Sequence, residues 1–369
     1  MNVSGGWEVL ATDSKVVQLG RYNVQQGQSS VSGLSSGAFM TVQLHLAHSA
    51  SFVGAGIIAG GPFRCAETFP GAAPVAEDAF IQNSLYICLN PLVPQTAPNA
   101  EHLAKLARQT AAAGEIDPVE HLADDKVYIF TGSKDEVVFS DTVARTKRFY
   151  ELLGVRPEHI DYDDTVPAGH SIITQNPEDS PLGTNQPPYI NQGDFIQSHR
   201  VLGHIHGKLN PPSERPSGRL VRFDQREFLS FLGDDDQQAR RDSMSDYGYA
   251  YIPKAVEDGE PARVHIALHG CKQGYNYVEY TNGRRNTQNS PPYGNRYVTT
   301  TGYNELADSN NFIILYPQAE GTDNGYTQNP EGCWDWWGYS SASAQRPDYY
   351  SRNAIQIRAI HDMLKRLGG

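Results

Sequence analysis

The sequence of 369 residues lacks several features that would point to a membrane or a nucleic acid. No apolar run reaches the roughly 18 residues that a membrane-spanning helix needs. Residues 1–14 have neither the basic start nor the apolar centre of a secretory signal peptide, so either the chain works in the cytosol or its leader has been removed or replaced. The net charge is −12, and no basic stripe interleaved with aromatic residues is present. We therefore expect neither nucleic acid nor anionic membrane surfaces as partners.

Cysteine is also scarce. Cys65, Cys88, Cys271 and Cys333 include no close pair with the spacing of zinc ligands, so no metal or other cofactor is expected. Four cysteines allow three disulfide pairings. Cys65 and Cys88 flank one loop-like insertion, which favours the bridges Cys65–Cys88 and Cys271–Cys333 and an oxidising compartment. Four buried free thiols in a cytosolic protein are the alternative.

One motif organises the chain. Gly33, Ser35 and Gly37 spell G-x-S-x-G between a predicted strand at residues 28–31 and a predicted helix. This is the nucleophile elbow of an α/β-hydrolase, in which a tight strand-to-helix turn exposes the serine hydroxyl. Ser35 is therefore the candidate nucleophile, and the backbone N–H of Ser36 is a candidate donor to an oxyanion. A Ser/Gly turn without chemistry is the alternative.

Two further candidates follow later strand-like runs. Asp135 comes directly after an apolar run, at the strand end where this fold holds its acid. His170 lies in a Gly/Pro loop after the next predicted strand. The order Ser35, Asp135, His170 is the order of an α/β-hydrolase triad. Asp163 and Asp164 are rival acids.

Other segments alternate between strands and helices, as is typical of α/β proteins. Strands are predicted at residues 16–19, 52–59, 126–131, 159–163, 218–224, 247–253, 263–268 and 312–317, and helices at residues 100–113, 141–153, 194–209 and 352–367. A Pro/Gly/Ala-rich insertion at residues 60–98 is expected to be a surface loop held by the first disulfide. His204 and His206 lie two apart on one predicted helix and face different sides, so they do not indicate a metal site.

A second oxyanion motif comes late in the chain. His269, Gly270 and Cys271 form an HG-type motif that in an ordinary α/β-hydrolase precedes the nucleophile, whereas here it follows the histidine. We therefore predict one circularly permuted α/β-hydrolase domain over residues 1–369, with a mostly parallel sheet flanked by helices. Its parts are the half with nucleophile, acid and histidine at 28–170, an insertion and connection at 171–246, and the permuted first half of the sheet at 247–367.

Taken together, the motifs resemble the secreted poly(3-hydroxybutyrate) depolymerases whose lipase box lies near the N-terminus. Besides the triad, the similarity includes P-Y-I-N at 188–191, L-N-P-P at 209–212, F-D-Q at 223–225, Y-I-P-K at 251–254, L-H-G-C-K-Q at 268–273 and C-W-D-W-W-G-Y at 333–339. The resemblance implies a secreted serine esterase that cleaves this polyester through an acyl-enzyme. We also expect a monomer that does not insert into a membrane.

The resemblance also implies roles for individual residues. Ser35 would be the nucleophile, His170 the base and Asp135 its orienter, with the N–H groups of Ser36 and Cys271 as the oxyanion hole. Asn329 and Trp334 match the positions that line the crevice for the polymer chain. A carboxylesterase acting on carbohydrate or small esters (feruloyl or acetylxylan type) and a non-catalytic polymer-binding protein remain alternatives, because a fold does not fix the acyl group.

Overall fold

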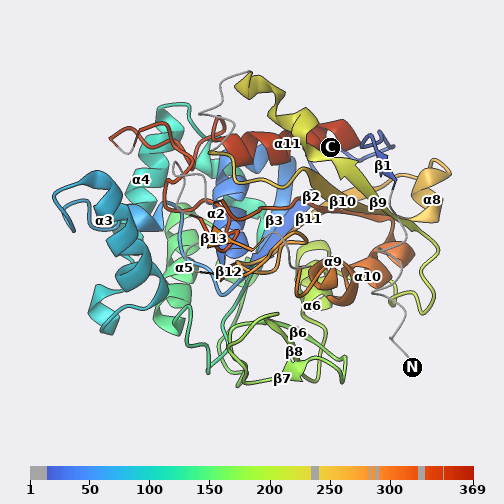
Figure 1. Ribbon diagram of the computed structural model, residues 1–369, viewed down its shortest axis with the longest axis horizontal. Helices are drawn as coiled ribbons and strands as arrows, with labels where there is room; N and C mark the ends of the chain where they lie inside the picture. Colours follow the sequence, from blue (N-terminus) through green and yellow to red (C-terminus); the bar gives the residue numbers. More distant parts are fainter. Residues whose placement is uncertain (1–14, 234–240, 282–283, 287–290, 323–328, 344) are drawn as a thin grey trace.

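The computed structural model describes residues 15–233, 241–281, 284–286, 291–322, 329–343 and 345–369. The sequence interpretation of residues 1–14 therefore lies outside the described residues. At the centre is a nine-stranded sheet (Figure 1). In spatial order its strands are β1 (Val16–Val17), β9 (Arg219–Asp224), β10 (Tyr247–Ile252), β14 (Phe312–Tyr316), β11 (Arg263–Leu268), β2 (Ser29–Leu34), β3 (Phe52–Ile58), β4 (Lys126–Phe130) and β5 (Ile160–Asp163).

Strand β2 is a central strand, and it is buried along its whole length. It pairs in parallel with β11 on one side and with β3 on the other. Continuous burial is expected of a parallel strand that is covered by helices on both faces. Only β10 among the longer strands runs antiparallel to its neighbours, β9 and β14. The sheet is therefore mixed but mostly parallel, as predicted.

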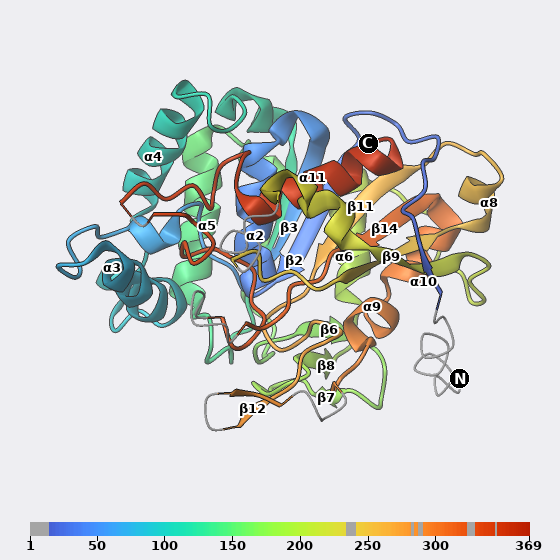
Figure 2. The same cartoon turned by 45° about the horizontal axis from the view of Figure 1, so that its top comes forward.

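Helices cover both faces of this sheet, and Figures 1 and 2 show them from two directions. The helices of the described residues, not all of which lie on the sheet, are α2 (Ser36–Ala47), α3 (Ala76–Asn83), α4 (Ala100–Ala112), α5 (Ser140–Leu153), α6 (Gln197–His206), α8 (Lys254–Glu257), α9 (Arg296–Thr300), α10 (Tyr303–Asn310) and α11 (Ile355–Leu367). Shorter helical turns are η1 (Ser49–Ser51), η2 (Cys65–Glu67), η4 (Pro94–Thr96), η5 (Val119–Asp124), η6 (Pro157–His159) and η7 (Gln225–Leu232). No helix in the described ranges is both long and apolar enough to span a membrane.

Alternation along β2 determines which helix meets which face. Ser30 and Ser32 point toward α6 and α10, where their hydroxyls bond His206 and Tyr303 at 2.8 and 2.6 Å. Because successive side chains of a strand point to opposite faces, Val31 faces the other side. There α2 packs on β2 and β3, and α11 packs on α2. The serine at the end of β2 is thus held between two helical layers.

The strand order agrees with the permuted order predicted from the sequence. From β2 to β5 the strands follow the chain outward to one edge, whereas on the other side of β2 the strands come from residues 219–316, except for the short edge strand β1. The last helix, α11, ends beside the segment that leads into β2, where the backbone N–H of Tyr22 donates to the carbonyl of Leu367 at 2.9 Å. The end of the final helix and the segment that leads into the elbow strand are therefore adjacent in space although they lie at opposite ends of the chain.

The other predicted strands and helices are present within three residues at each end, but the prediction of a loop at residues 60–98 was wrong. Residues 60–98 are not a loop, because they form α3 and a π-helix, η3 (Ser84–Leu89). Phe80, on α3, packs with Ala66 against Trp337. Residues 171–216 contain the predicted helix, as α6, together with strands that the sequence analysis did not predict. These strands form a three-stranded sheet of β6 (Ile172–Thr174), β8 (Ile190–Gln192) and β7 (Ser180–Pro181), and a further pair joins β12 (Tyr280–Thr281) to β13 (Arg284–Arg285).

Candidate active site

Ser35 stands on the turn between β2 and α2, in a conformation that side chains rarely adopt. Its φ is 57° and its ψ is −123°, and such strain persists only where the surroundings enforce it. A Cβ on Gly33 would lie 2.3 Å from the carbonyl carbon of Gly37, and one on Gly37 would lie 2.3 Å from the carbonyl oxygen of Leu268. Both glycines of the motif are therefore required by close backbone approach.

Asp135 and His170 meet beyond the carboxyl ends of β4 and β5. The Nδ1 atom of His170 lies 2.8 Å from Oδ2 of Asp135, and both side chains are almost fully buried. The other carboxylate oxygen, Oδ1, accepts hydrogen bonds from the backbone N–H groups of Val137 and Val138 at 2.8 and 2.9 Å. A carboxylate fixed in this way holds the proton of the imidazole on Nδ1 and leaves Nε2 able to accept another.

The rival acids have other partners. Oδ1 of Asp163 accepts from the backbone N–H and the hydroxyl of Thr165 at 3.0 and 2.7 Å, and Oδ2 lies 3.4 Å from Arg200. Asp164 lies beside Tyr162, where burial and then the charge of Asp164 raise the pKa of the phenol. The structure therefore brings Asp135, rather than either alternative, to the histidine.

A pocket of about 300 Å³ brings the predicted residues together. Ser35 and His170 both line it, as do Ser36 and Cys271, whose backbone N–H groups were predicted to bind an oxyanion. Most of the other lining residues are apolar; the remaining lining set is Leu34, Ile81, Ser84, Leu85, Leu89, Val137, Tyr189, Gly270, Glu331, Cys333, Trp336 and Trp337. An apolar cavity with polar groups gathered around one serine is typical of a site for an uncharged organic substrate.

The HG motif lies beside the elbow because β11 pairs with β2. His269 is fully buried, and burial lowers its pKa to about 4, against the opposing effect of its hydrogen bond to Gly270. Nδ1–H donates to the carbonyl of Gly270 at 2.7 Å, and Nε2 accepts from the N–H of Ala319 at 3.0 Å. The Gln273 side chain accepts from the N–H of Gly270 at 2.6 Å. A neutral His269 and Gln273 thus shape the loop that carries Cys271.

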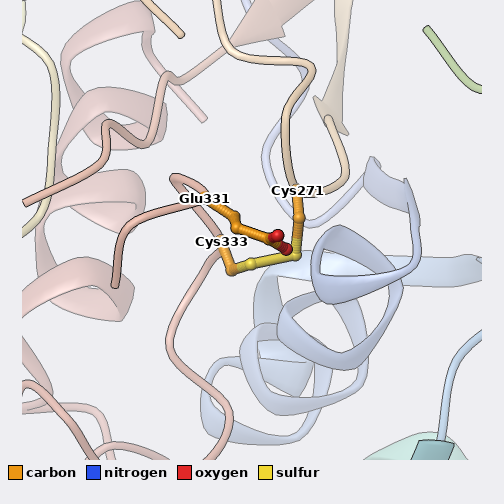
Figure 3. Close-up of side chains that lie close together, drawn as sticks. All are labelled: Cys271, Glu331 and Cys333. Carbon is orange, nitrogen blue, oxygen red and sulfur yellow. A yellow bond between two sulfur atoms is a disulfide. The ribbon is translucent and has the colours of Figure 1, made fainter. Parts of the chain in front are cut away.

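The structure contains both disulfides that the sequence analysis pairs, Cys65–Cys88 and Cys271–Cys333. Figure 3 shows the second bridge with the Glu331 side chain beside it. Together these three residues form the group of potential metal ligands found in the described part of the chain. The sulfurs are bonded to each other, so they offer no thiolate to a metal ion. The disulfide instead joins the loop after β11 that carries Cys271 (the oxyanion loop, residues 269–273) to the tryptophan loop (residues 329–340).

A charged pair strengthens the same connection. Nζ of Lys272 lies 2.9 Å from a carboxylate oxygen of Glu331, and the backbone N–H of Lys272 donates to the Glu331 carbonyl at 2.8 Å. Burial lowers the pKa of Lys272, but the hydrogen bond and charge of Glu331 more than offset burial, so the pKa is raised. The lysine is therefore a stable cation at the rim of the pocket.

Asn329 and Trp334 lie behind the pocket wall and not in it. Trp334 is fully buried, and neither residue belongs to the lining set. The side chain of Asn329 donates to the carbonyl of Cys333 at 2.8 Å and accepts from its N–H at 3.0 Å. The tryptophans that line this pocket are Trp336 and Trp337. Asn329 and Trp334 therefore support the Cys271–Cys333 disulfide, whose two cysteines line the pocket.

Asp335 is a residue of the site that sequence reasoning missed. Its Oδ1 accepts from the backbone N–H groups of residues 337–339, and its Oδ2 accepts from the N–H and hydroxyl of Ser340. Burial raises the pKa of Asp335, and these hydrogen bonds oppose the rise. The carboxyl group folds the loop into a turn, while the Trp336 ring stacks on Phe39 at 4.0 Å. The sequence does contain a signal that could have pointed to Asp335, because an acidic residue within a run of tryptophans is unusual.

The two disulfides support different parts of the pocket, so their removal should have different kinetic effects. Replacing Cys271 and Cys333 by serine frees the loop that holds one proposed oxyanion N–H, and one such donor is worth about 10²–10³ in kcat. We expect kcat to fall by at least about tenfold while the circular dichroism spectrum remains that of a folded protein.

The matched control replaces Cys65 and Cys88 by serine, because that bridge holds the helical insertion that supplies Ile81 and Leu85 to the pocket. Its removal should raise KM more than it lowers kcat. Both variants are assayed on a short-chain ester, with thermal unfolding followed in parallel. If the variant without Cys271 and Cys333 had the same kcat as the unmodified chain, the disulfide would not be needed to hold the oxyanion loop in place.

A mostly parallel sheet with helices on both faces, and a strained serine near a hydrogen-bonded histidine and aspartate at its strand ends, are the features of an α/β-hydrolase. No protein-family model matches the chain. It is 34% identical over 356 residues to a poly(3-hydroxybutyrate) depolymerase of Delftia acidovorans, covering 95% of this chain and 62% of the relative. It is 30% identical over 375 residues to a polyhydroxybutyrate depolymerase of Talaromyces funiculosus, covering 98% and 94%. The chain belongs to the polyhydroxybutyrate depolymerase family.

Solved structures agree with this placement. The crystal structure of PHB depolymerase from Penicillium funiculosum matches with a TM-score of 0.75 and 28% identity, covering 95% of this chain and 98% of that one. A serine-to-alanine variant of PHB depolymerase in complex with an R3HB trimer matches with the same TM-score, 27% identity and the same coverage. The chain spans less than two thirds of the length of its Delftia relative, at 62%.

Proposed function

We propose that this chain, as one α/β-hydrolase domain, is a serine esterase that hydrolyses poly(3-hydroxybutyrate) to short hydroxybutyrate oligomers or monomer. The observation that carries the proposal is the hydrogen bond between Asp135 and His170 at a mainly apolar pocket that Ser35 also lines. The names of the similar proteins and the complex of one of them with an R3HB trimer support the choice of polyester.

The proposed chemistry is acyl transfer. Nε2 of His170 takes the proton of the Ser35 hydroxyl as its oxygen attacks the ester carbonyl, and the charge of Asp135 stabilises the resulting imidazolium. The N–H groups of Ser36 and Cys271 donate to the oxyanion of the tetrahedral intermediate. The histidine then protonates the leaving alcohol. Water attacks the acyl-enzyme with His170 as base, and Ser35 is released with a carboxylic acid product.

The exposed apolar surface of the helical insertion (residues 60–98) is consistent with a large apolar substrate. Among the described residues, six of the seven exposed large apolar side chains belong to this insertion. They are Phe69, Val75, Leu85, Tyr86, Leu92 and Val93. Leu85 also lines the pocket, so exposed apolar surface continues from the proposed catalytic groups onto the outside of the molecule. Such surface is costly in water unless it meets an apolar partner.

We also propose that the chain works outside the cytosol. The two disulfides support this location, because such bonds persist in oxidising compartments and are rare where glutathione keeps thiols reduced. A solid polyester substrate would in addition be reached there by diffusion of the enzyme.

The function is tested by clearing of a turbid suspension of amorphous poly(3-hydroxybutyrate), with Ser35→Ala as the paired variant. We expect the unmodified chain to clear the suspension, and the variant to be slower by at least about 10³-fold because it lacks the nucleophile. Cleavage of short-chain or carbohydrate esters without clearing would favour another carboxylesterase. Cleavage of neither, with no labelling of Ser35 by a serine-directed phosphonate, would favour a binding protein.

A further inference from the structure

Two loops that carry the proposed catalytic groups are already interlocked by their backbones. The acid loop (residues 132–138) holds Asp135, and the histidine loop (residues 166–170) holds His170. Ser133 and Lys134 donate their N–H groups to the carbonyls of Val166 and Ala168 at 2.8 and 3.0 Å. These bonds hold the beginning of the acid loop against the histidine loop. Near His170 itself, both loops are contacted by a third segment.

That third segment, residues 182–189, comes from the part of the chain that connects the two halves of the sheet. Its Asn185 is half-buried, and Oδ1 accepts two backbone hydrogen bonds, from His170 at 2.7 Å and from Glu136 at 3.1 Å. The Nδ2 group donates to the carbonyl of Lys134 at 3.0 Å. One side-chain amide therefore contacts the residues on both sides of Asp135 and the backbone of the histidine.

The segment is itself held firmly. The buried Asn191 on β8 donates to the carbonyls of Leu182 and Thr184 at 2.9 and 2.8 Å. At the other end, Nε2 of Gln273 donates to the carbonyl of Pro188 at 2.7 Å, while the Oε1 atom of the same side chain binds the oxyanion loop. Residues 182–189 are thus anchored both to a strand and to the loop that carries Cys271.

Tyr189 closes the segment against the histidine. Its ring meets the His170 imidazole edge-on, with ring centroids 5.4 Å apart and an interplanar angle of 82°. Since His170 is bonded through its backbone to Asn185 and packed against Tyr189, a movement of residues 182–189 would move the imidazole relative to both Asp135 and Ser35. Catalysis is sensitive to displacements of this size, because a misplacement of about 1 Å costs on the order of 10² in rate.

We propose that Asn185 is a positioning residue of the active site, which sets the distance between the acid loop and the histidine loop. This inference rests on the proposed function and extends it to a residue outside the triad and the oxyanion hole. Asn185 touches no reacting atom. It acts by holding the backbones of Glu136 and His170 on one oxygen atom, so that the imidazole is aligned before the substrate binds.

The test compares Asn185→Ala and Asn185→Asp with the matched control Asn176→Ala. Asn176 is also half-buried and also accepts a backbone N–H, from Glu178 at 3.1 Å, but within its own turn and away from the catalytic loops. We measure kcat and KM on a short-chain hydroxybutyrate ester, the rate of phosphonate labelling of Ser35, and the thermal midpoint. Activities are compared at a temperature at which each variant is folded.

We expect Asn185→Ala to lower kcat by about 10- to 100-fold and to slow labelling similarly, with KM within about twofold because the pocket lining is unchanged. Asn185→Asp keeps an oxygen for both accepted bonds but turns its second oxygen toward the Lys134 carbonyl, so it should recover only part of the kcat. Asn185→Ala with the kcat of Asn176→Ala would overturn the inference, as would a loss that appears in KM and not in kcat. An unmodified chain that neither cleaves esters nor reacts with the phosphonate would instead defeat the proposed function.

Discussion

Replacing Asp135 by asparagine is expected to lower kcat by about 10⁴-fold without unfolding the protein. The reason lies in the two different partners of the carboxylate. Oδ1 accepts from the N–H groups of Val137 and Val138, so the amide oxygen of an asparagine would remain there. The amide NH₂ would then point at Nδ1 of His170 and fix the imidazole with its proton on Nε2. That tautomer cannot accept the proton of Ser35.

The measurement is kcat on a short-chain ester, with thermal unfolding as the check on folding. The matched control is Asp163→Asn, which alters the rival acid, whose partners are Thr165 and Arg200. We expect this control to keep kcat within about twofold, since its side chain does not contact the histidine. A larger loss in the control than in Asp135→Asn would mean that the acid has been wrongly identified.

Replacing Gly37 by alanine should have the largest effect on stability. The new Cβ would lie 2.3 Å from the carbonyl oxygen of Leu268 and 2.5 Å from that of His269. Both atoms belong to backbone at the end of a central strand, so neither can move as a flexible side chain would. To relieve the clash, α2 must move away from β11. Part of the apolar core would then be less well buried. We expect a loss of at least about 4 kcal/mol in the free energy of unfolding.

The corresponding fall in the thermal midpoint is about 5 °C or more, because the entropy of unfolding grows with chain length. The control is Gly203→Ala, in α6, where nothing lies within 4 Å of the new Cβ. Alanine is favoured over glycine in a helix by about 1 kcal/mol, so this variant should unfold at a slightly higher temperature. A Gly37→Ala protein with an unchanged midpoint would show that the elbow and β11 are less tightly packed than the structure indicates.

The placement of Ser35, Asp135 and His170, the proposed triad, at one edge of the sheet could be predicted from the sequence because each depends on local rules. The elbow needs glycines next to its serine, and the acid and histidine lie where strands end, so motif and strand pattern were enough. The late HG motif likewise led to the permuted strand order. These features are encoded within short stretches of chain, so they do not depend on knowing which distant residues meet.

Other features depend on contacts between distant residues. Nothing near Asn185 indicates that its amide binds the backbone of His170, and the burial of Trp334 follows from packing behind the oxyanion loop. The insertion at residues 60–98 has the Pro/Gly/Ala composition of a loop, yet Phe80 finds a partner in Trp337 and a helix forms around it. Composition gave no sign of that partner, since Trp337 lies more than 250 residues away.

The permuted strand order also determines when in its synthesis this molecule can become active. Ser30 on β2 and His265 on β11 are register partners 235 residues apart in the chain. At ordinary translation rates, the interval between their appearance is on the order of ten seconds or more. During that time the nucleophile strand has an unpaired edge and no loop to stabilise an oxyanion. Under the proposed function, a growing chain contains the proposed nucleophile early and lacks the loop of the proposed oxyanion hole until its last third has been made.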